Sequence, residues 1–303
     1  AAHLDALPVP EKVQQPPVQQ PVHLDIAVSH ITFAYEDQHQ VYQDFSLYCR
    51  QGAHIALVGT SGSGKSTLAA LLVRFWEPQQ GTISLGNIPL SQYPEQQLRQ
   101  LIGVIEQDTF LFSATLRENL LLVNPQATEE QLQQALAFAV LEDVAATLPD
   151  GLDTYIGDNG YRLSGGQRQR VALARAWLRD CPVVILDEIF QGLDTITAAQ
   201  IRHNLEQWGR GRTMIYITHT VQQLQTMEQI YVLQQGVIVE QGTADRLLQQ
   251  QNSIFHLLMI LSYKTKYLLS ALWVKTRSRF VKYKHLWVHC HNSCYSHTPF
   301  LSA

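Results

Sequence analysis

The amino-acid sequence predicts an α/β fold, with a mostly parallel central sheet and helices on both faces of that sheet. Short, continuously apolar runs recur along the chain, for example at residues 182–186 and 213–218. Such runs are typical of parallel strands, which are buried on both faces. Helical segments separate these runs, and strands that alternate with helices indicate a layered α/β architecture. A third observation is a glycine-rich turn that joins one apolar run to a helix.

This glycine-rich turn is the most informative part of the chain. Residues 59–66 read GTSGSGKS and fit the pattern G-x-x-x-x-G-K-[ST] at every fixed position. They follow the apolar run 55–58 and precede a helix predicted over 67–75. The apolar residues of that helix recur at helical spacing, namely Leu68, Leu71, Leu72 and Phe75. In this context glycines let backbone N–H groups turn toward phosphate oxygens, and the helix N-terminus adds a partial positive charge.

The turn is therefore predicted to be a phosphate-binding loop. In this interpretation Lys65 reaches the β- and γ-phosphates of a nucleotide, and the Ser66 hydroxyl is a ligand of Mg²⁺. The predicted nucleotide contacts in this stretch are Gly59, Thr60, Ser61, Gly62, Ser63, Gly64, Lys65, Ser66 and Thr67. The alternative is a Gly/Ser-rich turn that binds nothing, and the flanking strand and helix argue against it.

The later elements continue the alternation of helices and strands. A helix is predicted over residues 129–147, and a second over residues 168–178. One face of the first helix is apolar and comprises Leu132, Leu136, Ala139 and Val140. The segment 230–241, with Gly236 at its centre, is typical of a hairpin near the end of the fold.

Charge and cysteine content exclude several classes of protein. All 26 acidic residues lie in residues 1–245 beside 14 Lys and Arg, whereas residues 246–303 hold eight Lys and Arg and no acid. An acidic body argues against a nucleic-acid-binding face, which needs a basic patch. The four cysteines are too scattered for a disulfide framework, so Cys49 and Cys181 are expected to be core thiols in a reducing compartment. No apolar run reaches about 18 residues, the length of a membrane span.

The composition divides the chain into three parts. Residues 1–22 are rich in Pro and Gln and are predicted to be an extended linker. The chain lacks an initiator Met, so we expect a further segment to precede this linker. Residues 23–254 hold the alternating strands and helices. Residues 255–303 are basic and contain many aromatic, Cys and His residues.

A second glycine motif separates this chain from other proteins with a phosphate-binding loop. Residues 163–167 read LSGGQ and precede a strongly helical run. Small residues at a helix start form another cradle for an anion, because free amides point at it. The motif resembles the signature of the ATP-binding cassette (ABC) family, and other motifs of that family occur in the family's order. The resemblance covers residues 23–252, about three quarters of the chain.

The resemblance implies the fold of an ABC cassette, a P-loop NTPase with an antiparallel β subdomain and an α-helical subdomain. It implies that ATP and Mg²⁺ bind, with Asp187 holding the metal shell and Glu188 acting as general base. His219 matches the switch histidine at the γ-phosphate, and Gln107 matches the Q-loop glutamine that senses Mg²⁺ and the γ-phosphate. The remaining implied nucleotide contacts are Tyr35, which stacks on adenine, Ser164, Gly165, Gly166 and Gln167 of the signature, and Asp194 of the D-loop. Taken singly, Tyr35 could equally be an ordinary strand aromatic, and Gln107 and His219 could be surface polar residues.

The stretch 107–120 indicates which kind of cassette this is. It reads QDTFLFSATLRENL and resembles type I exporters, in which this apolar loop packs against the membrane domain. Residues 156–160, IGDNG, resemble the exporter loop before the signature, which usually has Glu at the position of Asp158. Residues 111–122 and 191–194 resemble the cysteine/glutathione exporters required for cytochrome bd assembly, although lipid and drug exporters share most of these positions.

The sequence departs from the family pattern at two places, and neither change removes a catalytic group. Glu106 stands where Pro is usual before the Q-loop glutamine, which adds a charge beside the apolar loop. Residues 189–192 read IFQG in place of the common Ala-Thr-Ser-Ala of the D-loop. We expect the second change to alter communication between two paired sites.

The resemblance implies an ATPase domain that powers export. Two cassettes, of the same or different chains, would pair head to tail, and ATP would bind between one phosphate loop and the partner's signature. A transmembrane domain would be the second partner, with the cassette on the cytoplasmic face of a bacterial inner membrane and in only indirect contact with lipid. The alternative is a truncated or regulatory module that binds ATP without transport.

The C-terminal tail matches no family pattern, and three interpretations of it remain open. Its His and Cys residues could bind zinc, although their spacing fits no standard finger. These residues are His285, His289, Cys290, His291, Cys294 and His297. The sudden loss of acidic residues suggests a non-native tail from a shifted reading frame, and a basic, aromatic segment could also lie on a membrane surface.

Overall fold

The structure is a computed structural model of the 303-residue chain. It describes residues 21–36, 40–157, 160, 163–218, 221–250 and 253–258, with the side chains of 221–223 left aside. The chain divides into two compact units, residues 1–256 and 257–303, and all the elements named below belong to the first. Most of the predicted linker, Asp158, His219 and the six Cys and His residues named as zinc candidates in the tail lie outside the described residues.

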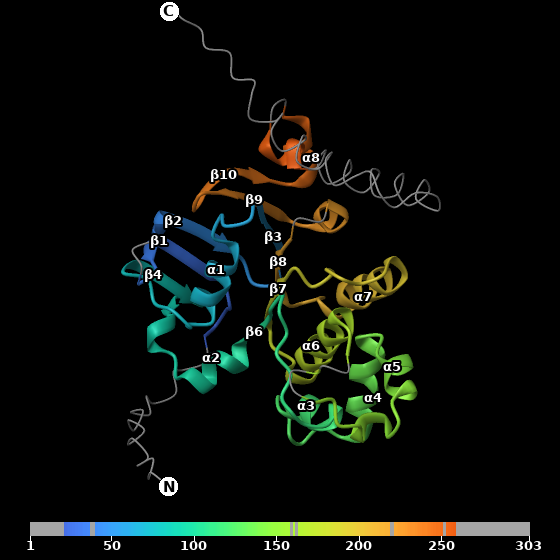
Figure 1. Cartoon of the computed structure of the whole chain (residues 1–303). Helices are drawn as coiled ribbons and strands as arrows, with labels where there is room; N and C mark the ends of the chain where they lie inside the picture. The colour runs from blue at the N-terminus through green and yellow to red at the C-terminus, as the bar shows by residue number, and fades with distance from the viewer. Residues whose placement is uncertain are drawn as a thin grey trace, which may run out of the picture. The chain divides into compact units, whose positions relative to one another are not determined.

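Two sheets form the centre of the first unit (Figure 1). The larger one has the strand order β10-β9-β3-β8-β7-β6, and its pairs are parallel except for the hairpin of β9 and β10. Its strands are β3 (His54–Gly59), β6 (Ile102–Ile105), β7 (Val183–Asp187), β8 (Thr213–Ile217), β9 (Gln229–Gln234) and β10 (Val237–Gly242). The smaller sheet is antiparallel with the order β2-β1-β4-β5, from β1 (Ile26–Ala34), β2 (Gln40–Cys49), β4 (Gln80–Leu85) and β5 (Ile88–Pro89).

The parallel strands are buried because their sequences are continuously apolar. All five residues of β7 and all five of β8 are buried. By contrast, β2 alternates buried and exposed positions along much of its length, as a strand with one solvated face does. The predicted mostly parallel α/β fold is confirmed, and the antiparallel sheet forms a separate layer.

Helix α1 (Lys65–Leu72) belongs to the core that joins the two sheets. Leu68 and Leu72 are buried in one cluster with Ile55 of β3 and Phe33 of β1. The other helices are α2 (Glu95–Leu101), α3 (Leu116–Leu121), α4 (Glu129–Phe138), α5 (Glu142–Thr147), α6 (Gly165–Arg179), α7 (Thr195–Trp208) and α8 (Ala244–Gln249). Short 3-10 turns lie at Leu90–Gln92, Gly151–Asp153 and Val221–Thr226.

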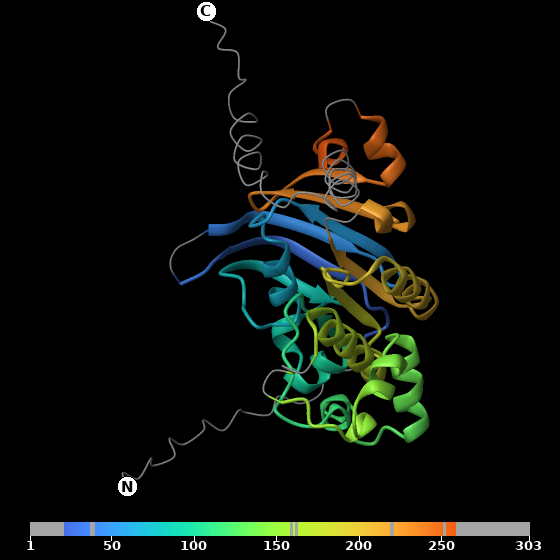
Figure 2. The ribbon, with the colours of Figure 1, turned by 45° about the vertical axis from the view of Figure 1, so that its right-hand side comes forward.

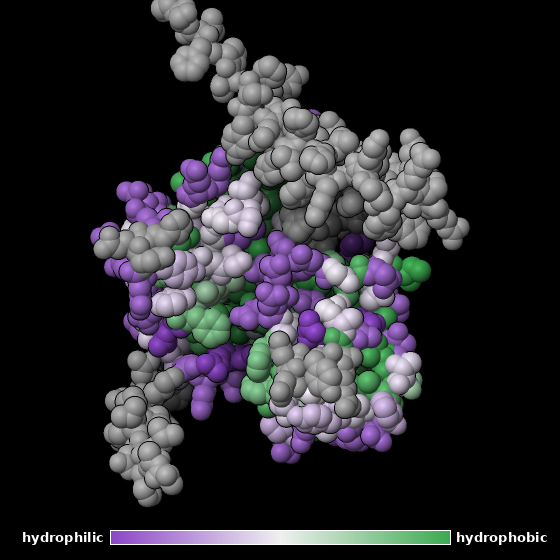
Figure 3. Space-filling view, in the orientation of Figure 1, coloured by the Kyte–Doolittle hydropathy of each residue, from purple (hydrophilic) through white to green (hydrophobic). Residues whose placement is uncertain are grey.

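Helices α3, α4 and α5 form a group beside α6, away from the antiparallel sheet (Figure 1). Figure 2 shows the same separation, with this green group below the strands. The space-filling view shows a largely polar face, on which apolar residues appear among the helices at the lower right (Figure 3). In the described residues no helix is both long and apolar enough to cross a membrane.

Two predicted helices end earlier than their apolar spacing indicates. The helix predicted over 67–75 ends at Leu72, and Arg74 adopts the left-handed region with φ 60°, so that Phe75 lies outside the helix and is 59% exposed. The helix predicted over 129–147 is two helices, because Val140 has φ 55° and the amide of Leu141 bonds the carbonyl of Leu136 at 2.8 Å. Apolar spacing continued across both breaks, so the period alone could not locate them.

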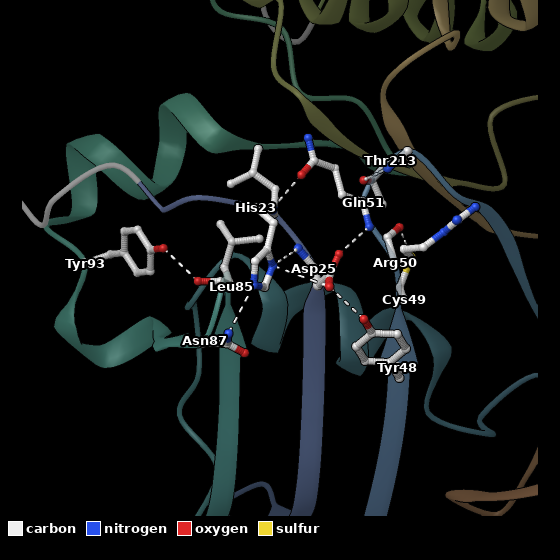
Figure 4. Close-up of polar contacts among 12 residues, drawn as sticks. His23, Asp25, Tyr48, Cys49, Arg50, Gln51, Leu85, Asn87, Tyr93 and Thr213 are labelled. Atoms are coloured by element: carbon white, nitrogen blue, oxygen red, sulfur yellow. Dashed lines mark hydrogen bonds and ion pairs between the residues drawn. The ribbon is translucent and has the colours of Figure 1, made fainter.

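A polar network fixes the chain where it enters β1 (Figure 4). One carboxylate oxygen of Asp25 accepts the amide of Gln51 at 2.7 Å, and the other accepts the hydroxyl of Tyr48 at 2.7 Å. His23 lies 3.4 Å from the same carboxylate, and its ring bonds the Asn87 side chain at 3.0 Å. We call these five residues the Asp25 network. Hydrogen bonds from Tyr48 and Gln51 hold the pKa of Asp25 below its usual value.

Candidate functional site

The glycine-rich turn closes the carboxyl end of β3. Gly59 ends the strand, and a Cβ on it would lie 2.2 Å from the carbonyl oxygen of Leu233. Gly64 precedes α1 with φ 106°, a backbone conformation that favours glycine, and its carbonyl accepts the Tyr42 hydroxyl at 2.6 Å. The first amides of any α-helix, including α1, have no partner within the helix. Such amides are suited to binding an anion.

The Lys65 side chain folds back into the loop and is only 7% exposed. Its ammonium donates to the carbonyls of Gly59 at 3.0 Å and Thr60 at 2.9 Å, and lies 3.4 Å from the Ser63 hydroxyl. Burial lowers the pKa of Lys65, while the nearby Glu188 and Asp187 carboxylates act in the opposite direction. A buried ammonium held by uncharged loop oxygens is well placed to exchange them for phosphate oxygens.

The hairpin of β9 and β10 supports the loop from outside. The amide of Gly236 donates to the carbonyl of Ser63 at 3.1 Å. Gly236 has φ 75°, and a Cβ on it would lie 1.7 Å from the carbonyl oxygen of Val41, so the turn requires glycine. The predicted hairpin therefore holds the backbone of the loop at Ser63.

Ser66 and Asp187 lie together beside the loop. Asp187 ends β7, is 6% exposed, and lies beside the Ser66 hydroxyl. Burial raises the pKa of Asp187, whereas the Ser66 hydroxyl and the charge of Lys65 oppose this rise. Both residues line a cavity of about 240 Å³ together with Gln107. These neighbours meet because the carboxyl ends of parallel strands share one edge of the sheet.

The donors at this cavity suit Mg²⁺. A hydroxyl, a carboxylate and an amide oxygen are hard ligands, and Mg²⁺ is usually held by one or two carboxylates together with substrate phosphates. In the described part of the chain no cluster of three or more His, Cys, Asp and Glu side chains could hold a metal ion. The hydroxyl, carboxylate and amide oxygens at the cavity fit Mg²⁺ bound together with a nucleotide.

Glu188 directly follows β7 and has a constrained backbone. Its φ is 48°, which is uncommon for a residue other than glycine, and its amide donates to the carbonyl of Ile217 at 2.9 Å. Its own carbonyl accepts the amide of Gln191 at 3.1 Å. The half-buried Glu188 therefore sits in a fixed turn beside β8. His219, which follows β8 in the sequence, lies outside the described residues.

The signature residues form a regular helix start. The Ser164 hydroxyl accepts the Gln167 amide at 3.2 Å, and the Gln167 side chain accepts the Ser164 amide at 2.8 Å. This capping box satisfies two donors of the first turn, between which Gly165 and Gly166 lie. A Cβ on Gly166 would lie 2.8 Å from the carbonyl oxygen of Gly192, so the signature packs closely on the D-loop. The described lining of the cavity contains no residue of the signature.

Asp194 begins α7 as its N-cap. Its carboxylate accepts the amides of Ile196 at 3.1 Å and Thr197 at 3.0 Å. The pKa of Asp194 is held below its usual value first by the Thr197 side chain and then by the amides of Thr197 and Ile196. The predicted D-loop aspartate thus has a structural task in its own chain.

Tyr35 lies on the antiparallel side of the loop. Its hydroxyl is 3.0 Å from that of Thr67, and its half-buried ring packs edge-on against Phe33 and Trp76, with centroids 5.0 Å and 5.7 Å away. Trp76 is 42% exposed and was missed in the sequence, where it follows the helix without a motif. Stacking of Tyr35 on adenine remains a prediction.

An exposed aromatic pair lies on the loop before α3. Phe110 and Phe112 are 60% and 52% exposed, with ring centroids 5.1 Å apart. The loop is held from beneath by the buried Asn119, which bonds both backbone groups of Phe112, and by Arg175, which donates to the carbonyl of Phe110 at 2.9 Å. Burial lowers the pKa of Arg175 to about 10. Two large apolar rings are therefore held in solvent by a rigid support.

Two glutamines that connect the loops were not assigned a role from the sequence. Gln169 of α6, 4% exposed, donates to the carbonyl of Glu106 at 3.1 Å and accepts from the Thr109 hydroxyl at 3.3 Å. Gln191 accepts from the Gln107 side chain at 2.7 Å. In the sequence Gln191 is marked only as a departure from the usual D-loop.

Comparison with known proteins shows which family has this arrangement. Residues 42–191 match the family model described as ABC transporter. The chain is 42% identical over 225 residues to an uncharacterized ABC transporter ATP-binding protein, YwjA, of Bacillus subtilis, and 41% identical over 233 residues to the glutathione/L-cysteine transport system ATP-binding/permease protein CydC of Escherichia coli. These matches cover 74% and 77% of this chain.

The matches cover only part of those relatives. The chain spans 39% of the first and 40% of the second, about two fifths of the length of the curated relatives it matches. An ATP-dependent lipid A-core flippase of Legionella pneumophila is 42% identical over 224 residues. A solved structure of a bacterial Atm1-family ABC exporter with ATP bound superposes with a TM-score of 0.77 at 31% identity, and covers 80% of this chain and 43% of that one.

Proposed function

We propose that this chain, which belongs to the ABC family and carries an ATP-binding domain of the exporter kind, hydrolyses ATP as one of two paired cassettes and so drives export. The family match and the exporter relatives support ATP binding and ATPase activity. Pairing, Mg²⁺ dependence and coupling to a membrane domain are parts of the proposal.

One observation carries the pairing. The cavity beside the phosphate loop is lined by Ser66, Gln107 and Asp187, whereas the signature residues 163–167 pack on the D-loop of their own chain. The signature amides form a second anion-binding site. Within one chain, this second site does not complete the site at the phosphate loop. A second cassette, turned head to tail, would bring its signature to this loop.

The chain's own residues would divide the work in the following way. Lys65 and the loop amides bind and orient the β- and γ-phosphates, which is the largest part of catalysis of phosphoryl transfer. Glu188, fixed in its turn by the bond to Ile217, accepts a proton from the attacking water. Ser66, Asp187 and Gln107 would hold Mg²⁺, which when bound supplies positive charge to the phosphate oxygens.

A transmembrane domain is the proposed partner at the exposed aromatic pair. Phe110 and Phe112 present apolar area on a rigid loop, and exposed apolar patches mark interaction sites. The relatives named as ATP-binding/permease protein and flippase are longer than this chain and suggest what such a domain does. We place the cassette on the cytoplasmic face of the membrane, where ATP is available, in contact with lipid only through its partner.

The proposal is tested with the Glu188→Gln variant. Multi-angle light scattering is measured with and without Mg-ATP, beside the ATPase rate of the wild-type chain. We expect a monomer that becomes a dimer only with Mg-ATP, because bound ATP that is not hydrolysed holds the two cassettes together. ATPase activity should fall about 10²- to 10⁴-fold, the usual contribution of a general base.

A matched change on an exposed helix face, Glu130→Gln, should leave the ATPase rate and the scattering unchanged. A persistent Glu188→Gln monomer that binds ATP would refute pairing of identical chains, and wild-type binding without hydrolysis would support the regulatory alternative.

A further inference from the structure

The side chains of Gln107 and Gln191 form a bridge between two loops of the site. The Gln107 Nε2 donates to the Gln191 Oε1 at 2.7 Å, although the two residues are 84 positions apart in the chain. Gln107 follows β6 and lines the cavity that holds Ser66 and Asp187. Gln191 lies in the turn that follows Glu188.

Gln191 is itself anchored to the residues that carry the chemistry. Its amide donates to the carbonyl of Glu188 at 3.1 Å, so it belongs to the turn that this residue begins. Gly192, the next residue, has φ 76° and packs against Gly166 of the signature helix. The Gln191 side chain therefore starts from a backbone that is fixed on both sides.

The side chains of Gln107 and Gln191 are both exposed. A free glutamine side chain loses about 1.5–2 kcal/mol of rotamer entropy when it is ordered. The neighbouring Glu106 carbonyl is held by Gln169, but that bond fixes only the backbone. The bond to Gln191 orders the side chain itself, and it uses the Nε2 donor so that the amide oxygen is left to accept or to bind a cation.

We infer that Gln191 is a positioning residue that holds the Gln107 side chain, so that its amide oxygen is oriented for the divalent cation at the Ser66 and Asp187 site. This inference rests on the proposed function, because it concerns the metal that accompanies ATP. The inference requires the Oε1 acceptor of Gln191. A side chain of the same length without an acceptor would not hold Gln107 in place. Movement of the D-loop would move Gln107 as well, which ties the metal ligand to the element that contacts a partner cassette.

The test compares two replacements in the full chain. Gln191→Met keeps the size of the side chain and removes the acceptor, whereas Gln191→Glu keeps an acceptor oxygen. The affinity for Mn²⁺, a spectroscopic substitute for Mg²⁺, is measured by electron paramagnetic resonance with the non-hydrolysable analogue AMP-PNP present. We expect Gln191→Met to raise the Kd for Mn²⁺ about three- to tenfold, the value of one hydrogen bond. Gln191→Glu should bind Mn²⁺ at least as tightly as the wild type.

A double-mutant cycle separates positioning from a general structural effect. Gln107→Ala should weaken Mn²⁺ binding, and Gln191→Met should add nothing further in the Gln107→Ala background, because Gln191 acts through Gln107. Additive losses in the double variant, or a Gln191→Met variant with wild-type Mn²⁺ affinity, would overturn the inference.

The wild-type chain distinguishes this failure from failure of the proposed function. A wild type that binds AMP-PNP equally well with and without Mn²⁺ would contradict the metal site of the proposed function. Normal metal dependence in the wild type, with no change in Gln191→Met, contradicts only the role of Gln191. Gln134→Met on the exposed face of α4 is the matched control and should behave as the wild type.

Discussion

The phosphate loop and the Asp25 network each hold a charged side chain by hydrogen bonds, but the partners lie at different distances along the chain. Lys65 bonds carbonyls five and six residues away in its own loop. Asp25 bonds Tyr48 and Gln51, which lie 23 and 26 residues away and belong to the end of β2 and the turn after it. Partners within one loop can be exchanged for a ligand without disturbing the fold, whereas distant partners connect strands. The comparison assigns binding to the first region and stability to the second.

Of the substitutions that test this comparison, the one at Lys65 is expected to have the largest effect, on nucleotide affinity. Lys65→Ala removes a charged donor, and hydrogen bonds to charged groups contribute about 1.5–3 kcal/mol, so the Kd for AMP-PNP should rise roughly 10- to 150-fold. Isothermal titration calorimetry measures this directly. Arg99→Ala, which removes a surface cation on α2, should keep wild-type affinity. An unchanged Kd in Lys65→Ala would break the assignment of binding to this loop.

A smaller effect is expected at Asp25, and it should appear in stability alone. Asp25→Ala removes the acceptor of the Tyr48 hydroxyl and the Gln51 amide, two hydrogen bonds at solvent-exposed positions, which should lower the free energy of unfolding by about 0.5–1.5 kcal/mol in urea. Nucleotide affinity should not change. Asp44→Ala is the control, because Asp44 and its partner His30 are 74% and 78% exposed, and its loss should cost less than about 0.5 kcal/mol. Equal losses of unfolding free energy in the two variants would contradict the stabilising role assigned to Asp25.

The smallest effect is a dependence of stability on pH. Bonds from Tyr48 and Gln51 hold the pKa of Asp25 below its usual value. The stabilisation is therefore complete above the unfolded-state pKa, about 3.9, and is lost as the pH falls through the lower folded-state value. The difference in unfolding free energy between wild type and Asp25→Asn should stay constant from pH 7 to 5 and narrow below about pH 4. Urea titrations at each pH measure it, and a difference that persists undiminished at pH 3 would contradict this linkage.

Much of the fold and the loop chemistry was predictable because the responsible residues are close in sequence. The glycines, Lys65 and Ser66 occur in one turn between a strand and a helix, and the Ser164 and Gln167 cap spans a single helical turn. The ends of α1 and α4 were not predictable, since Arg74 and Val140 adopt left-handed backbone conformations that apolar spacing does not reveal. The Gln107–Gln191 bond is a contact between side chains of two distant loops, and only the order of β6 and β7 in the sheet brings those loops together.

The hydrogen bond from Gly236 to Ser63 determines the stage of synthesis at which the phosphate loop gains its support. The loop at residues 59–64 emerges from the ribosome long before the hairpin that supports it, because synthesis proceeds from the N-terminus. A nascent chain that stops short of β10 contains every residue of the loop motif without the turn that holds Ser63. We therefore expect the loop to reach its final backbone arrangement only after the hairpin of β9 and β10 has been synthesised.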